Sequence, residues 1–298
     1  MRPPGVQGAP GDEGLMYIAT AALSACGGCE NSLLSIGEPL VAFLSEHTIS
    51  FSSLLLDRHS VSPSDVVLVS GCVRTTEELR LALEIDRTSR KIVAVGSCAV
   101  YGGVAGLRGP EPPQEERPDD TLPQVEPVAE PLDSRVAVEL YVPGCPPPPR
   151  LIFDALKSVV EGYTPLHFDG TVCSDCPRTL PRGRTKSLTL HPGRGHDEDV
   201  CLLGKGMLCM GPVTRGGCRA ACTSAGAACS GCRGPSDMVL SSQLHSVYSD
   251  TVACLARTSR QRPEKVAGQI STMLDILYLY TGGDPETRAR AKERVPGD

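Results

Sequence analysis

The sequence contains no tryptophan, and aromatic residues make up only 4% of its 298 residues. Single-stranded nucleic acids are usually bound on aromatic stacking platforms, which this composition does not offer. Positive charge is also in short supply, because 29 Lys and Arg stand against 35 Asp and Glu, for a net charge of −6. The chain therefore lacks the electrostatic footprint of a nucleic-acid-binding protein, and we expect no nucleic-acid partner.

Long hydrophobic runs are missing as well. No stretch approaches the roughly 20 apolar residues that span a membrane. Residues 1–14 contain neither the apolar core of a signal peptide nor paired arginines. We therefore expect a flexible leader at 1–14, no membrane span and a cytoplasmic location. In such a reducing compartment the 14 cysteines should be free thiols or metal ligands rather than disulfides.

Short apolar runs alternate with helical patterns up to about residue 170. Strands are predicted at Leu15–Leu23, Ile49–Leu56, Val66–Val69, Ile92–Val95 and Val136–Val142. Helices are predicted from Asn31 to Leu44 with a kink or break at Pro39, from Thr75 or Thr76 to Ile85, and from Leu151 to about Val160. The proline-rich and acidic segment Gly109–Pro131 reads as a surface loop. This alternation predicts an α/β, flavodoxin-like doubly wound parallel sheet.

Cysteines follow the ends of four of these strands, at Cys26 and Cys29, Cys72, Cys98 and Cys145. Ligands of open α/β sheets bind at the carboxyl edge of the strands, where loops that are distant in sequence converge. Glycines beside these thiols allow the backbone to approach a bulky inorganic group. The pattern predicts a metal centre at the edge of the sheet.

The stretch from Cys173 to Cys232 holds eight cysteines among many glycines and prolines. It offers few side chains for an apolar core, so burial alone is not expected to offset its conformational entropy. Metal–thiolate bonds can supply that folding free energy. Eight thiolates suffice for two zinc ions or for two 4Fe–4S clusters.

Two helices are expected after this stretch, at Ser236–Ser259 and Pro263–Tyr280. The second has an apolar stripe, which we expect to pack on the chain's own sheet, with a partner subunit as the alternative. The predicted domains are thus the leader at 1–14, a sheet domain at 15–170, a cysteine-rich irregular domain at 171–235 and C-terminal helices at 236–298.

Several motifs carry a family resemblance. They are Cys26-x-x-Cys29, Gly96-Ser97-Cys98-Ala99 leading to Gly102-Gly103, Pro143-Gly144-Cys145-Pro146-Pro147, and Cys201-x7-Cys209-Met-Gly-Pro-Val-Thr-Arg-Gly-Gly-Cys218 followed by Cys229-x-x-Cys232. Together, over residues 15–235, they resemble the small subunits of NiFe hydrogenases, and the first three are shared in part with the 20 kDa-type subunit of complex I. The motif from Cys201 to Pro212 resembles most closely that of cytosolic hydrogenases of the F420-non-reducing, methyl-viologen-reducing type.

The resemblance implies three 4Fe–4S clusters as cofactors. Its ligand sets would be Cys26, Cys29, Cys98 and Cys145 for a proximal cluster, Cys173, Cys176, Cys201 and Cys209 for a distal cluster, and Cys218, Cys222, Cys229 and Cys232 for a medial cluster. It also implies an electron-transferring subunit of a hydrogenase. Its partners would be a large subunit with the NiFe site and a further flavin or Fe–S subunit, and the chain itself would hold no catalytic residue.

Two other interpretations stay open. A zinc-stapled scaffold would use the same cysteines, although zinc ribbons rarely draw ligands from four strand ends. A complex-I-like or formate-linked electron-transfer module would not need the eight C-terminal cysteines. Among single residues, Cys72 and Cys254 are expected to be bystander thiols, and Glu30 a carboxylate that is solvated or at a helix N-terminus. His191 and His196 are expected to be loop residues rather than ligands.

Overall fold

The computed structural model describes residues 15–57, 60–107, 123–166, 168, 170–183, 187–190, 199–240, 247–271 and 279–281. These residues form two compact units that meet in the sequence between residues 166 and 167, and the stretch starting at Tyr280 belongs with the first unit. Within this described part of the chain, no helix is long and apolar enough to cross a membrane. The predicted leader at 1–14 and the two histidines His191 and His196 lie outside it.

The first unit is built on a five-stranded parallel sheet with the strand order β2-β1-β3-β5-β7. Its strands are β1 (Tyr17–Ala22), β2 (Thr48–Ser52), β3 (Ser64–Ser70), β5 (Ser89–Val95) and β7 (Leu140–Val142). The central strand β3 is buried along its whole length, which explains its continuous apolar sequence. The order is that of a flavodoxin-like doubly wound sheet, so the predicted fold class is confirmed.

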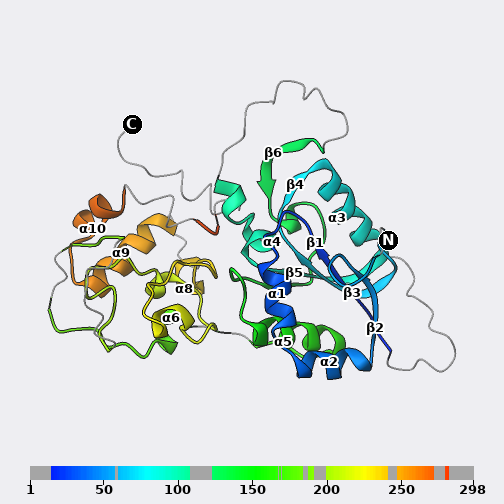
Figure 1. Cartoon of the computed structure of the whole chain (residues 1–298). Coiled ribbons are helices and arrows are strands. Elements are labelled where there is room, and N and C mark those ends of the chain that lie inside the picture. The colour runs from blue at the N-terminus through cyan, green and yellow to red at the C-terminus, as the bar shows by residue number, and fades with distance from the viewer. Residues whose placement is uncertain are drawn as a thin grey trace. The chain divides into compact units, whose positions relative to one another are not determined.

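Helices cover both faces of this sheet, with α3 on one side and α2 and α5 on the other (Figure 1). The helices of the unit are α1 (Gly28–Leu34), α2 (Glu38–Ser45), α3 (Thr76–Thr88), α4 (Ser97–Tyr101) and α5 (Pro149–Glu161), with the 3-10 helices η1 (Val104–Leu107) and η2 (Leu132–Ser134). Side chains of one strand alternate between the faces, so Val67 and Val69 pack in one core with Ala82 and Ile85 of α3. Thr75 begins α3 as predicted, through a capping box with Glu78.

Three local predictions for this unit need correction. The strand predicted at Val136–Val142 is present only as β7 (Leu140–Val142). The first helix begins at Gly28 and not after Asn31, and the residue before it, Gly27, adopts the left-handed conformation as its N-cap. The expected break at Pro39 is real, since Pro39 lies in the first turn of the separate helix α2. The segment predicted as the loop Gly109–Pro131 contains the strand β6 (Val125–Glu130), which pairs antiparallel with β4 (Val73–Thr75). The proline and glutamates of β6 are rare in strands, so the sequence gives no strand signal here. A two-stranded edge ribbon tolerates them.

The second unit consists of short helices and long connections. Its elements are α6 (Val172–Asp175), η3 (Gly211–Val213), α7 (Ala221–Ser224), α8 (Asp237–Leu240), α9 (Val247–Ser259) and α10 (Pro263–Ile270). Residues 241–246 and 272–278 of the two predicted C-terminal helices lie outside the described residues.

The second unit has its own hydrophobic core, contrary to the expectation from the sequence. Leu202 and Leu203, from between the cysteines, are fully buried together with Leu255 of α9 and with Val266 and Ile270 of α10. Val266 and Ile270 of the predicted stripe therefore pack in the core of this unit and not on the sheet, whereas Met273, Leu274 and Leu277 lie outside the described residues and Tyr280 belongs with the first unit. The cysteine-rich segment lacks a core only when it is considered alone, because the C-terminal helices provide the other half of the apolar surface.

Candidate metal centres

The cysteines at the sheet edge follow strands that are close neighbours in the sheet. Cys26 and Cys29 flank the start of α1 after β1, Cys98 lies in α4 after β5, and Cys145 follows β7. The strands β1, β3, β5 and β7 are adjacent in that order, and all are parallel. Their carboxyl ends therefore lie along one edge, as the sequence predicted.

Hydrogen bonds fix the three cysteine loops to one another. The Ser97 N–H donates to the Gly144 carbonyl (2.9 Å), and the Gly144 N–H donates to the Ser97 hydroxyl oxygen (3.1 Å), which joins the loops after β5 and β7. The buried Ser32 hydroxyl on α1 donates to the Pro147 carbonyl (2.6 Å), which joins α1 to the Cys145 loop. The thiols are thus held by a prearranged frame.

The four thiols at the sheet edge lie within electrostatic reach of one another. Burial raises the pKa of Cys29 to about 12, and the charges of Glu30, Cys98, Cys145 and Cys26 add to that rise. Burial also raises the pKa of Cys98 and of Cys145, with a further contribution from Cys26 to both. Several thiolates within reach of one another in a partly desolvated site require strong positive charge to compensate them, which a bound metal centre provides.

At two positions beside these sulfurs a side chain would collide with a sulfur atom, and both positions are glycine. Gly96 (φ 89°) precedes Cys98, and a Cβ atom on it would overlap the Cys29 Sγ. Gly103 (φ 59°) has a backbone that leaves only 2.6 Å between such an atom and the Cys98 Sγ. Each position is closed to other residues by sterics as well as by backbone conformation.

Cys72 follows β3, and its thiol is buried. Its backbone pairs with Ser24 through two hydrogen bonds (3.1 and 3.2 Å), and its buried thiol points to the Ser24 carbonyl at 3.8 Å. Burial raises its pKa to about 12, and the charge of Cys98 is the next cause. Cys72 is therefore near the set of four, and its role as a bystander stays a prediction.

Glu30, in the first turn of α1, is tied into the structure and not merely solvated. Its Oε1 accepts a hydrogen bond from the Ser70 hydroxyl at the end of β3. Its Oε2 is buried and has no hydrogen-bond partner among the described residues. The expected position at a helix N-terminus is correct, while full hydration is not.

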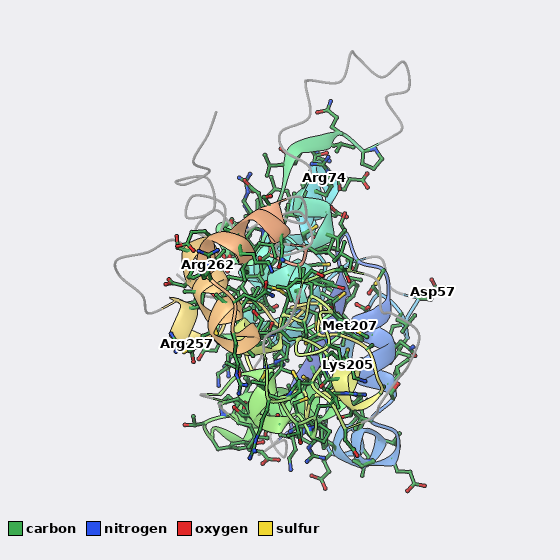
Figure 2. All side chains as sticks on the ribbon, turned by 90° about the vertical axis from the view of Figure 1, so that its left-hand side faces the viewer. Asp57, Arg74, Lys205, Met207, Arg257 and Arg262 are labelled. Atoms are coloured by element: carbon green, nitrogen blue, oxygen red, sulfur yellow. The ribbon has the colours of Figure 1, made fainter. Side chains whose placement is uncertain are left out.

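In the second unit, Cys173, Cys176, Cys201 and Cys209 lie close together. Burial raises the pKa of Cys173 to about 12, followed by the charges of Cys209, Cys201, Cys176 and Cys254. Cys173 lies on α6 and Cys176 ends that helix, while Lys205 and Met207, labelled in Figure 2, belong to the connection between Cys201 and Cys209.

Cys229 connects this group to the remaining cysteines. Burial raises the pKa of Cys229, N–H donation from Gly231 lowers it, and the charges of Cys209 and Cys232 raise it further. The Cys229 N–H also donates directly to the Cys209 Sγ at 3.3 Å. Cys218 packs against the hydrophobic core and Cys222 lies exposed on α7, and their grouping with Cys229 and Cys232 stays a prediction.

Cys254 is a neighbour of the second group that its sequence position did not reveal. It lies on α9, one turn before Arg257, which is labelled in Figure 2, and its thiol donates to the Pro212 carbonyl (3.5 Å). It also adds to the rise of the Cys173 pKa. The sequence carries no signal for this proximity, since 81 positions separate the two residues along the chain.

The thiol groups fit iron–sulfur clusters by their chemistry. Such clusters are held by four cysteine thiolates. In the set Cys26, Cys29, Cys98, Cys145 the charges of the other three cysteines reach Cys29, and in the set Cys173, Cys176, Cys201, Cys209 the charges of the other three reach Cys173. Among the described residues, no three His, Cys, Asp or Glu side chains form a site for a single metal ion.

Comparison with known proteins gives three findings. The family model described as "NADH ubiquinone oxidoreductase, 20 Kd subunit" matches residues 26–159. A subunit of the vhu-type F420-non-reducing hydrogenase of Methanocaldococcus jannaschii is 32% identical over 287 residues, which cover 91% of this chain and 96% of that protein. Its counterpart from Methanococcus voltae is 34% identical over 238 residues, 73% of this chain and 82% of that protein.

Among solved structures, a chain of the [NiFeSe] hydrogenase from Desulfovibrio vulgaris Hildenborough superposes with a TM-score of 0.51 and 19% identity. The match covers 78% of this chain and 98% of that one. At this identity the likeness concerns the fold alone. The matched region covers more of the chain than the sheet unit, which ends near residue 166. The likeness in fold therefore includes residues of the cysteine-rich part.

Proposed function

Because this chain belongs to the same family as these F420-non-reducing hydrogenase subunits, and is thus a hydrogenase subunit, we propose that it conducts electrons between a NiFe site and a redox partner. The NiFe site would lie in a separate large subunit, and the partner would be a further flavin or Fe–S subunit. The observation that carries the proposal is the convergence of four thiols, from loops after β1, β5 and β7, at the carboxyl edge of the sheet.

Three 4Fe–4S clusters, when bound, would supply one-electron redox chemistry at potentials that the protein sets. Cys26, Cys29, Cys98 and Cys145 would hold the proximal one, Cys173, Cys176, Cys201 and Cys209 the distal one, and Cys218, Cys222, Cys229 and Cys232 the medial one. The chain's own contribution is to fix these thiols, exclude water and donate hydrogen bonds to sulfur. The N–H groups of Gly211 and Cys229 donate to the Cys209 sulfur, and that of Val104 donates to the Cys98 sulfur.

Metal analysis of the complex purified without oxygen tests the proposal directly. Three sets of four cysteines predict about twelve iron atoms and about twelve sulfides per chain. Bound zinc without iron would support the zinc-stapled scaffold and end the electron-transfer proposal. About eight irons would mean that one of the three ligand sets is wrong.

Cys72→Ser tests the division between ligands and bystanders at the sheet edge. Because the Cys72 thiol faces the Ser24 carbonyl, a serine hydroxyl at this position has a hydrogen-bond acceptor in reach. We therefore expect iron content and hydrogen-dependent dye reduction to stay within about 20% of the unmodified complex, as for a free buried cysteine that is no ligand. The matched variant Cys98→Ser should lose the EPR signal of the proximal cluster. Loss of that signal in Cys72→Ser would instead make Cys72 a ligand and displace one of the four.

A further inference from the structure

Arg178 contacts the backbone of two cysteine loops besides its own. It follows Cys176 by two positions, its Nε donates to the carbonyl of Thr223 (2.6 Å), and its Nη1 donates to the carbonyl of Val200 (3.3 Å). Thr223 directly follows Cys222, and Val200 directly precedes Cys201. One planar guanidinium thus reaches a proposed distal-cluster loop and a proposed medial-cluster loop with donors in a fixed fork.

The distal-cluster loops do not depend on this side chain. The segment after Arg178 pairs with the segment before Cys201 through backbone hydrogen bonds, from the Thr179 N–H to the Asp199 carbonyl (2.7 Å) and from the Cys201 N–H to the Thr179 carbonyl (2.8 Å). These bonds remain when the guanidinium is removed. Cys176 and Cys201 would therefore keep their relative positions without it.

The turn that carries Cys222 is held differently. It is the four-residue helix α7, entered through Arg219 and Ala220, which both have positive φ angles (54° and 52°). Its backbone hydrogen bonds, such as those from the Ser224 N–H to the Ala220 carbonyl (2.8 Å) and from the Ala227 N–H to the Cys222 carbonyl (2.9 Å), join residues within the turn. These backbone bonds fix its internal shape, and the buried Ala220 packs it on the core of the unit, but among these hydrogen bonds only the Arg178–Thr223 bond joins it to another cysteine loop. Cys222 itself is exposed.

We propose that Arg178 is a positioning residue for Cys222 and thereby keeps the medial cluster in its four-iron form. The inference rests on the proposed function, because it requires Cys222 to be the fourth ligand of that cluster. The charged donor makes a stronger bond to the Thr223 carbonyl than a neutral group would. Without it, we expect the exposed part of the turn, which includes Cys222, to shift and move Cys222 away from its iron, while the other three thiols remain.

The consequence is a defined redox reaction. When ferricyanide takes one electron from a 2+ 4Fe–4S cluster whose fourth ligand is displaced, one Fe2+ leaves and a 1+ 3Fe–4S cluster remains. The ferricyanide is reduced to ferrocyanide, so charge and iron balance. The oxidised 3Fe–4S product is paramagnetic and the 2+ 4Fe–4S cluster is not, so EPR separates them without any assay of hydrogenase activity.

The test compares four variants of the chain in the complex purified without oxygen. Arg178→Gln removes both the charge and the planar set of N–H donors. Arg178→Lys keeps the charge but not the planar set of donors, and Cys222→Ala removes the proposed ligand itself. Arg182→Gln, an exposed arginine four positions further on, serves as the matched control. Each is treated with ferricyanide, and iron content and the 3Fe–4S EPR signal are followed over time.

We expect Arg178→Gln to convert about 10–100-fold faster than the unmodified chain, the usual effect of losing a residue that orients a metal ligand. It should lose about one iron per chain and approach the behaviour of Cys222→Ala. Arg178→Lys should lie between, and Arg182→Gln should match the unmodified chain. Conversion in Cys222→Ala but not in either Arg178 variant would overturn the role of Arg178 and leave the proposed function intact. No conversion in Cys222→Ala would overturn both this inference and the medial ligand set.

Discussion

Replacing Gly96 by alanine should abolish the proximal cluster while sparing the others. Gly96 has φ 89° and ψ 155°, a backbone region that essentially only glycine adopts, at a cost of about 1–3 kcal/mol for other residues. The larger effect is steric, because the new methyl group would overlap the Cys29 sulfur. We expect iron to fall by about four atoms per chain, with loss of the proximal EPR signal and of hydrogen-dependent dye reduction.

A matched control separates the steric effect from backbone strain. Gly162 also has a positive φ (79°), at the end of α5, but a Cβ atom there would meet nothing within 4 Å. Gly162→Ala should therefore lower stability by about 1 kcal/mol and leave the iron content unchanged. Gly103→Ala, which crowds the Cys98 sulfur, provides a second test of the same site. Full proximal iron in both Gly96→Ala and Gly103→Ala would show that these sulfurs are not the ligands.

The second large effect concerns the direction of electron flow. Cys98→Ser should reduce electron exit to every acceptor by an order of magnitude or more, because a proximal ligand is lost. Cys176→Ser should reduce delivery to the physiological acceptor to a similar degree while sparing hydrogen–deuterium exchange, which needs only the NiFe site. The physical reason is that the sheet edge is a site prearranged by hydrogen bonds between its loops, which a large partner can cover, whereas Cys201 and Cys209 of the distal set lie on a long connection without helix or strand.

Cys254→Ser is the control for this comparison. Its thiol lies close to Cys173 but outside the proposed ligand sets, so neither electron delivery nor isotope exchange should change. If Cys176→Ser abolished isotope exchange in an intact complex and Cys98→Ser spared electron transfer, the proposed polarity would be reversed. Both assays use the assembled complex, so a variant that loses its large subunit is recognised by co-purification.

Local sequence signals predicted most of the first unit. Buried parallel strands are short apolar runs, and the run that became β3 is apolar because both its faces are covered. The capping box at Thr75 and Glu78 also acts within one turn, so its signal is local. The strand β6 was missed because its stability comes from pairing with β4, some fifty residues earlier, and not from its own composition.

The sequence by itself determined the fold class of the sheet and the placement of Cys26, Cys29, Cys98 and Cys145 at strand ends, because periodicity and turn residues act over a few positions. Only the tertiary structure decided that the charges of Cys26, Cys98 and Cys145 reach Cys29, that Cys72 faces the Ser24 carbonyl, and that the charge of Cys254 reaches Cys173. It also decided that α9 and α10 complete the core of the cysteine-rich unit. These are contacts through space between distant segments, and burial and hydrogen bonding at such contacts depend on a packing that no local pattern encodes.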